Sequence, residues 1–81
     1  MNAIDIPLDR LPPQQRAVIC AVDGERTFRR RLMEFGFVPG AEVTLRTTSP
    51  VGDPLDVVLR GARVSLRRRE AASIGVRLLG P

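Results

Sequence analysis

The sequence predicts a mainly β fold: a small β-barrel of about five strands with one α-helix between the first and second strands. Three observations predict this fold class. Short segments in which apolar and polar residues alternate recur along the chain, separated by turns rich in Gly and Pro. A single stretch has the periodicity of an amphipathic helix. The length of 81 residues allows one domain with a small core, and closing the sheet would hide its edges.

The helical stretch covers residues 25–35. Phe28, Leu32 and Phe35 recur at positions i, i+4 and i+7, so they share one face of a helix and are expected to pack on the core. Gly36 follows at the position where a left-handed residue commonly ends a helix. The helix is therefore expected to stop there and to lead directly into a strand.

Strands are predicted on both sides of this helix. The segment 16–22 (RAVICAV) is apolar on both faces, which is typical of a central strand. Residues 41–47 alternate between apolar and polar side chains, which indicates a half-buried strand. Residues 1–15 end in two prolines and two glutamines and are interpreted as a leader and turn. The domain is then expected to cover residues 16–81.

The second half of the chain predicts a loop, a hairpin and a last strand. Residues 49–54 contain two prolines and a glycine and are expected to form the loop. Two alternating segments, 55–60 and 62–67, flank a glycine and predict the β-hairpin. A single helical turn at 68–73 and a strand at 74–78 complete the order, which fits an SH3-like barrel.

The inward positions of these elements form the predicted core. A single cysteine excludes an intramolecular disulfide, so apolar packing has to stabilise the domain. The expected core residues are Ile19, Val22, Phe28, Leu32, Phe35, Val43, Leu45, Val57, Leu59, Val64, Leu66, Ile74 and Val76.

The composition excludes several functions. All 13 basic residues are arginine, against 9 acids, and the net charge is +4. Without lysine the chain cannot contain a P-loop, and without histidine it lacks the usual general base and the commonest metal ligand. No segment approaches the ~20 apolar residues of a membrane span, and the first residues do not form a secretory signal. We therefore expect a cytoplasmic protein that is not an enzyme and has no catalytic residues.

Three segments together resemble the FeoA family of bacterial ferrous iron uptake. They are the helix and turn RRRLMEFGFVPG (29–40), the loop SPVGDP (49–54) and the hairpin LRGARVSLRRREA (59–71). Each segment alone is unspecific, but their order and close spacing are similar to the helix, loop and hairpin of the family. Phe35 and Phe37 stand where the family has aliphatic residues.

The resemblance implies an accessory role. FeoA-like proteins work with FeoB, the membrane iron transporter that carries a cytosolic G-domain, so the implied partner is the cytosolic domain of a FeoB-type transporter. The implied contact with the membrane is through that partner alone. Ferrous iron is implied only by the pathway, with no intrinsic cofactor, and the expected state is a monomer or a weak homodimer.

A nucleic-acid-binding barrel is the main alternative. The arginine groups 29–31 and 67–69 would supply a basic patch. Small barrels that bind nucleic acid usually add stacking aromatics, but this chain has no Tyr or Trp, and acids are interleaved with the arginines. A solvated, ion-paired face is therefore favoured, and nucleic acid is not an expected partner.

No intrinsic metal site is expected. Cys20 lies in the first predicted strand without a second Cys or any His, so we interpret it as a small buried hydrophobe. A transition-metal site needs nitrogen or sulfur ligands, of which the chain offers one thiol. Carboxylates such as Asp53, Asp56 or Glu70 would hold a metal only weakly, at an interface between molecules.

A partner-binding surface is predicted at Arg29, Arg30, Met33 and Val51. In an SH3-like barrel the first long loop and the next one flank the same end of the sheet, so these four residues are expected to share one surface. An apolar centre with an arginine rim is typical of partner interfaces. Exchange of Met33 or Val51 for Asp is expected to weaken binding of the partner and to leave the fold intact.

Overall fold

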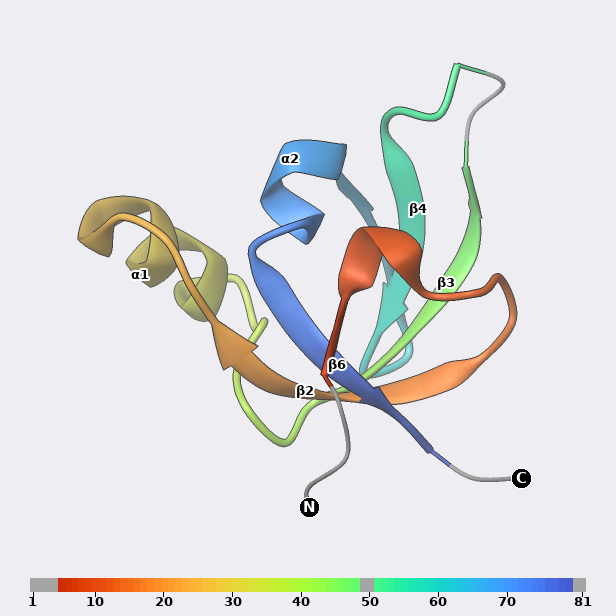
Figure 1. The fold of residues 1–81 in the computed structure, drawn as a ribbon, viewed down its shortest axis with the longest axis horizontal. Helices are drawn as coiled ribbons and strands as arrows, with labels where there is room; N and C mark the ends of the chain where they lie inside the picture. The colour runs from red at the N-terminus through yellow and green to blue at the C-terminus, as the bar shows by residue number, and fades with distance from the viewer. Residues whose placement is uncertain (1–4, 49–50, 80–81) are drawn as a thin grey trace.

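The computed structural model describes residues 5–48 and 51–79 (Figure 1). Within these residues a six-stranded antiparallel sheet has the order β1-β6-β2-β3-β4-β5. The strands are β1 (Ile6–Pro7), β2 (Arg16–Val22), β3 (Glu42–Thr48), β4 (Leu55–Leu59), β5 (Ala62–Leu66) and β6 (Ile74–Leu78). The helical segments are the 3₁₀ turn η1 (Leu8–Arg10) and the α-helices α1 (Arg26–Glu34) and α2 (Arg68–Ala71).

The prediction of a mainly β fold with one substantial helix between two strands is confirmed. The predicted helix is α1, the predicted helical turn is α2, and the alternating segments form β3, β4 and β5. The sixth strand, β1, was not predicted. No helix in the described part of the chain is long and apolar enough to span a membrane.

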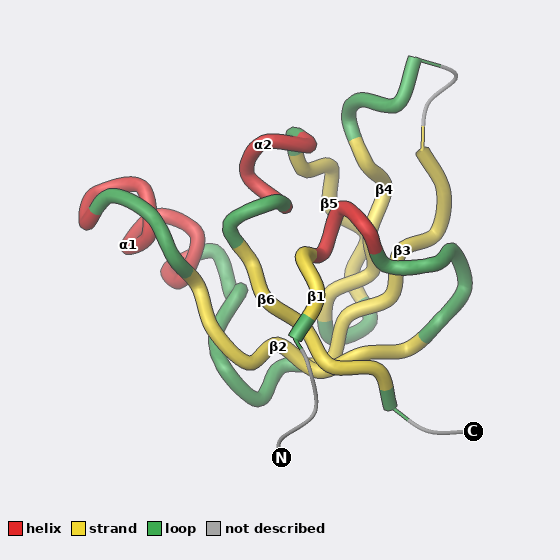
Figure 2. The backbone as a smooth tube through the Cα atoms, in the orientation of Figure 1, coloured by secondary structure: helices red, strands yellow, loops and turns green. Residues whose placement is uncertain are grey.

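The sheet is curved, so that β3 and β4 rise away from β2 and β6 (Figure 2). Register shifts interrupt two ladders, between Ile19 and Ala21 in β2 and between Leu45 and Thr47 in β3. Bulges of this kind bend a strand and increase its twist. Within the described residues β1 and β5 remain the two edges of the sheet. The expectation that closure hides every edge is therefore wrong, because β1 is only 2 residues long and pairs with β6 alone.

Both ends of α1 are capped. At the start, Oε1 of Glu25 accepts hydrogen bonds from two backbone N–H groups of the first turn, at 3.0 and 3.1 Å. At the end, the N–H of Gly36 donates to the C=O of Met33 and the N–H of Phe37 donates to the C=O of Leu32, both at 3.0 Å. These are the two bonds of a Schellman motif, and Gly36 has the expected positive φ, +116°.

The Schellman motif determines which phenylalanine is buried. Phe37 is fully buried, whereas Phe35 is 62% exposed. The prediction that Phe35 packs on the core is therefore wrong. Phe35 is the C-cap residue, and the positive φ of Gly36 turns the residue after it back toward Leu32, so that Phe37 packs on the core instead. The other predicted core residues are buried, or half-buried against the core in the case of Phe28 and Val64.

Residues 6–11 belong to the fold, which corrects the interpretation of residues 1–15 as a leader ahead of the domain. β1 pairs with β6, and Leu8 and Leu11 are 0% and 2% exposed. In the 3₁₀ turn η1, side chains three residues apart lie on the same side, so both leucines reach the core together.

Arg68, at the start of α2, connects segments that are distant in the sequence. Its backbone N–H donates to Oδ1 of Asp53 at 3.0 Å, and its Nε donates to the C=O of Gly52 at 2.8 Å. Its Nη1 lies 3.3 Å from the backbone oxygen and 3.5 Å from Oδ2 of Asp9. The Asp9 side chain is only 15% exposed, and its Oδ1 has no hydrogen-bond partner within the described residues. Arg68 therefore balances a mostly buried negative charge.

Removal of this arginine side chain should destabilise the domain. Arg68→Ala is expected to lower the free energy of unfolding by about 1–3 kcal/mol, because the buried carboxylate of Asp9 loses its cation. The exposed neighbour Arg69 has no ion pair in the described structure, so Arg69→Ala should change stability by less than about 0.5 kcal/mol. Urea denaturation of both variants measures the difference, and equal losses would contradict this role of Arg68.

Candidate functional site

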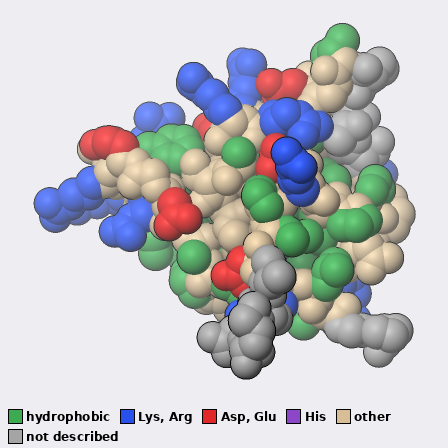
Figure 3. All heavy atoms as spheres, in the orientation of Figure 1, with side chains coloured by type: hydrophobic (Ala, Val, Ile, Leu, Met, Phe, Trp, Pro, Cys, Tyr) green, Lys and Arg blue, Asp and Glu red, His purple; other side chains and the backbone are tan. Residues whose placement is uncertain are grey.

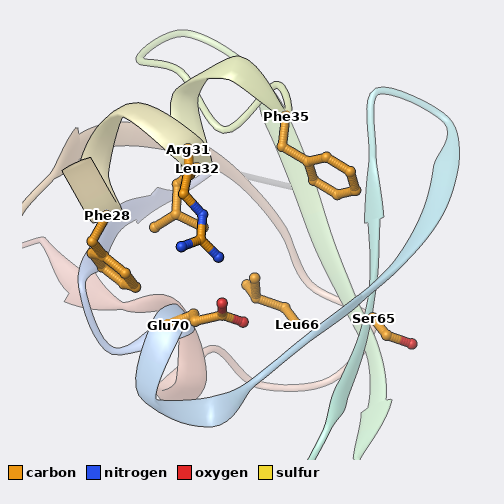
Figure 4. Close-up of a pocket in the computed structure, with 7 residues that line it drawn as sticks. All are labelled: Phe28, Arg31, Leu32, Phe35, Ser65, Leu66 and Glu70. Carbon is orange, nitrogen blue, oxygen red and sulfur yellow. The ribbon is translucent and has the colours of Figure 1, made fainter.

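A hollow of about 260 Å³ lies between α1, β5 and α2 (Figure 4). We call it the α1–β5 hollow. Its lining residues are Phe28, Arg31, Leu32, Phe35, Ser65, Leu66 and Glu70.

The α1–β5 hollow has an apolar floor and a charged rim. Leu32 and Leu66 are buried at its base. Arg31 and Glu70 point into the hollow from α1 and α2 (Figure 4). Oε1 of Glu70 accepts a hydrogen bond from the backbone N–H of Arg67 at 2.8 Å, which caps α2. The hollow can therefore accept an apolar side chain next to a charged group.

A second hollow, of about 430 Å³, lies along α1, and we call its surface the outer α1 face. It is lined by Arg26, Arg29, Arg30, Met33 and Glu34. Three of the four predicted partner-binding residues therefore lie together. The two arginines predicted to bind the partner are exposed, and Met33 is half-buried against the core.

Val51 does not belong to this surface. It is 85% exposed in the loop between β3 and β4. Figure 1 places α1 and this loop on opposite sides of the molecule. The expectation that Val51 and Met33 share one surface is therefore wrong. The loop packs toward α2 and η1, where Gly52 accepts the hydrogen bond from Arg68.

Arginine side chains gather around α1 and α2 (Figure 3). Five of the 13 arginines form ion pairs within the described residues. The other eight form none there, and six of them lie on α1 or at the start of α2. Those six are Arg26, Arg29, Arg30, Arg31, Arg67 and Arg69. Because these six arginines outnumber the acids Glu25, Glu34 and Glu70 of the same two helices and their caps, this side of the molecule favours an acidic partner.

The three carboxylates considered for a weak metal site are engaged separately. Asp56 forms ion pairs with Arg46 at 3.4 Å and with Arg63 at 2.9 Å. Asp53 accepts a backbone hydrogen bond at the start of α2, and Glu70 caps that helix. The described residues contain no group of three Cys, Asp or Glu that could hold a metal ion.

Cys20 lies at the bulge of β2 and is half-buried. Burial raises the pKa of its thiol, Asp5 adds to the increase, and the nearby Arg77 opposes it. A raised pKa lowers the thiolate fraction at neutral pH, and the thiolate is the form that attacks substrates and binds metals. The interpretation of Cys20 as a buried hydrophobe holds only in part, because the structure leaves it half-buried.

These features define a class of protein: a small SH3-like β domain whose unpaired charges lie on its surface. The FeoA domain profile matches residues 6–78. The chain belongs to the FeoA family. The match begins at β1, in agreement with the place of residues 6–11 in the fold.

Similar proteins share both the sequence and the fold. The Fe(2+) transport protein A/Fe(2+) transporter FeoB fusion protein of Porphyromonas gingivalis is 40% identical over 72 residues, covering 89% of this chain and 8% of the fusion protein. A FeoA-like protein from Clostridium acetobutylicum is 32% identical, with a TM-score of 0.87 over 100% of this chain and 93% of that one. FeoA of Stenotrophomonas maltophilia, described as an SH3 domain protein in complex with zinc, is 37% identical, with a TM-score of 0.76 over 93% and 91%. The family is associated with ferrous iron transport.

Sequence reasoning missed the α1–β5 hollow as a site, although it named several of its residues as core. Phe35 lines the hollow because its side chain is exposed, whereas helical periodicity predicts a buried one. A signal was present in the sequence. A glycine at the helix end followed by a large apolar residue is the pattern of a Schellman motif, in which that residue packs back on the helix.

Proposed function

We propose that this protein is a non-enzymatic accessory protein of ferrous iron uptake, which binds and modulates the cytosolic domain of a FeoB-type transporter. The observation that carries the proposal is the fusion protein of Porphyromonas gingivalis, in which a FeoA part and FeoB are one chain. Two domains that are fused in one organism commonly act together when they are separate in another. The site of action would be the cytoplasmic face of the membrane.

The charge distribution supports binding of a protein partner. The unpaired arginines of the outer α1 face surround the half-buried Met33, and such an arrangement is typical of interfaces with an arginine rim. Arginine side chains pair with carboxylates in two parallel hydrogen bonds, which gives an acidic partner both affinity and orientation.

Charge reversal on the outer α1 face should weaken this binding. The double variant Arg29→Glu/Arg30→Glu is expected to bind the cytosolic domain at least about tenfold more weakly, because two favourable charge contacts become repulsive. Val51→Asp, which introduces one acid on the other side of the molecule, is the control and should bind as the native protein does. Titration calorimetry measures the affinities and thermal melts check the fold.

The same titration tests the proposal against its alternative. Native affinity in the double variant would move the interface away from the outer α1 face. The alternative would be supported if the protein did not bind the transporter domain but bound oligonucleotides with an affinity that falls steeply as the salt concentration rises. The protein would then be a nucleic-acid-binding barrel.

A further inference from the structure

The outer edge of β5 is open. β5 pairs with β4 and is the last strand of the described sheet. The hairpin has a two-residue turn, so Leu59 and Ala62 form its closing hydrogen-bonded pair. Hydrogen-bonded and non-bonded pairs alternate along an antiparallel ladder. The backbone N–H and C=O groups of Arg63 and Ser65 therefore point away from β4, toward the open edge.

Hollows accompany this edge. Ser65 and Leu66 line the α1–β5 hollow, together with three apolar residues of α1 and its C-cap. The same two residues also line a third hollow, of about 460 Å³, which extends toward Pro54. Glu70 borders both hollows. A strand added next to β5 would thus find space for its side chains, and the α1–β5 hollow would take an apolar one.

The charges near the β5 edge indicate which kind of polypeptide would bind there. Arg31 lines one hollow and Arg67 the other, and neither forms an ion pair within the described residues; Glu70 is the one acid that borders them, and its Oε1 accepts a hydrogen bond from the backbone at the start of α2. A second copy of the chain would bring the same net charge of +4 to this edge. Like charges that meet in an interface are unfavourable. An acidic polypeptide would instead neutralise them.

We propose that the β5 edge and the α1–β5 hollow bind an extended acidic segment of a partner protein. The segment adds an antiparallel strand through the backbone groups of Arg63 and Ser65. Its alternate side chains place an apolar group in the hollow and carboxylates at the arginine rim, as in other cases of strand addition. The identity of the partner rests on the proposed function above, whereas the mode of binding rests on this geometry.

A peptide of alternating glutamate and valine, acetylated and amidated at its ends, tests the mode of binding. In the ¹⁵N-labelled protein it should shift the resonances of β5 and of residues 28–35. It should also slow hydrogen exchange of the Arg63 and Ser65 amides, which become hydrogen-bonded to the added strand. A peptide of alternating lysine and valine is the control and should not bind. Unchanged exchange at Ser65 at saturation, or tighter binding of oligothymidylate at the same edge, would overturn the proposal.

Ser65→Pro removes the N–H that faces the open edge, together with the hydroxyl, and proline is tolerated at such positions of edge strands. It should bind the peptide at least about tenfold more weakly, whereas Ser65→Thr, which keeps the N–H, should bind as the native protein does. If Ser65→Pro unfolds, Arg31→Glu and Arg10→Glu, which reverses an exposed arginine of η1, provide a second pair. Only Arg31 lines the α1–β5 hollow, so only its reversal should weaken binding. Equal affinity of the peptide for the edge variant and for its folded control would overturn the proposal.

The same variants separate this inference from the proposed function. Suppose that the transporter domain binds the native protein and Ser65→Pro, or Arg31→Glu where Ser65→Pro unfolds, equally well. The edge is then not the docking site, and the proposed function stands. If the peptide binds only with the edge intact and the transporter domain does not bind at all, the edge proposal stands and the proposed function fails.

Discussion

Phe37→Ala is expected to lower the free energy of unfolding by about 3–5 kcal/mol, the usual loss for a buried phenylalanine. Phe37 is 0% exposed and is the largest fully buried side chain of the described residues. A domain of this size has a total stability of only about 4–12 kcal/mol, so the variant should be close to unfolding. Urea or thermal denaturation measures the loss. Phe37→Leu, which leaves a smaller cavity, should give an intermediate value.

Phe35→Ala is the matched control, two residues away. Phe35 is 62% exposed, and its ring stacks on that of Phe37 with the ring centroids 6.1 Å apart. Loss of this stacking and of part of the ring's burial should cost less than about 1.5 kcal/mol. Equal losses for the two variants would show that the helix does not end as described, since only the Schellman turn makes the two phenylalanines different.

Gly36→Val is expected to lower the free energy of unfolding by about 2–3 kcal/mol, the sum of a strained backbone and a steric contact. The φ of Gly36 is +116°, which a β-branched residue strongly disfavours. A Cβ at this position would also lie 3.2 Å from Cδ2 of the buried Leu59. The loss is measured by chemical denaturation.

Gly40→Val separates the two causes. Gly40 also has a positive φ, +93°, but a Cβ there would meet no atom within 4 Å. This variant should therefore carry the backbone strain without the contact and lose less stability than Gly36→Val. A Gly36→Val variant as stable as the native protein would contradict the assignment of the helix end.

Much of the fold could be predicted because it is coded locally. Alternation identified the buried sides of β3 and β4, and the glycine between two alternating segments identified the β4–β5 hairpin. The turn of this hairpin shows why the glycine was informative. Arg60 and Gly61 both have positive φ, +50° and +86°, and a two-residue turn of this type needs a residue that tolerates such values. The apolar residues on both faces of β2 likewise reflected its place inside the sheet, between β6 and β3.

The candidate site could be predicted only in part. The sequence showed the arginines and the methionine of α1, and the structure brings Arg29, Arg30 and Met33 together because they share one helix. The prediction that Val51 shares the surface of α1 was wrong because it depended on the path of the loop between β3 and β4. That path depends on the hydrogen bond from Arg68 to Gly52, two residues that lie 16 positions apart in the sequence. The α1–β5 hollow was not predicted, because it depends on the packing of α1 against two later elements.

The sequence by itself determined the family, the order of the elements and the sides of the strands that face the core, since period, turn residues and helix signals act over a few neighbouring positions. The tertiary structure decided the rest. It brought Leu8 and Leu11 into the core and left the edge of β5 open beside an apolar hollow. Each of these depends on contacts between segments far apart in the chain, which residue patterns within one segment do not encode.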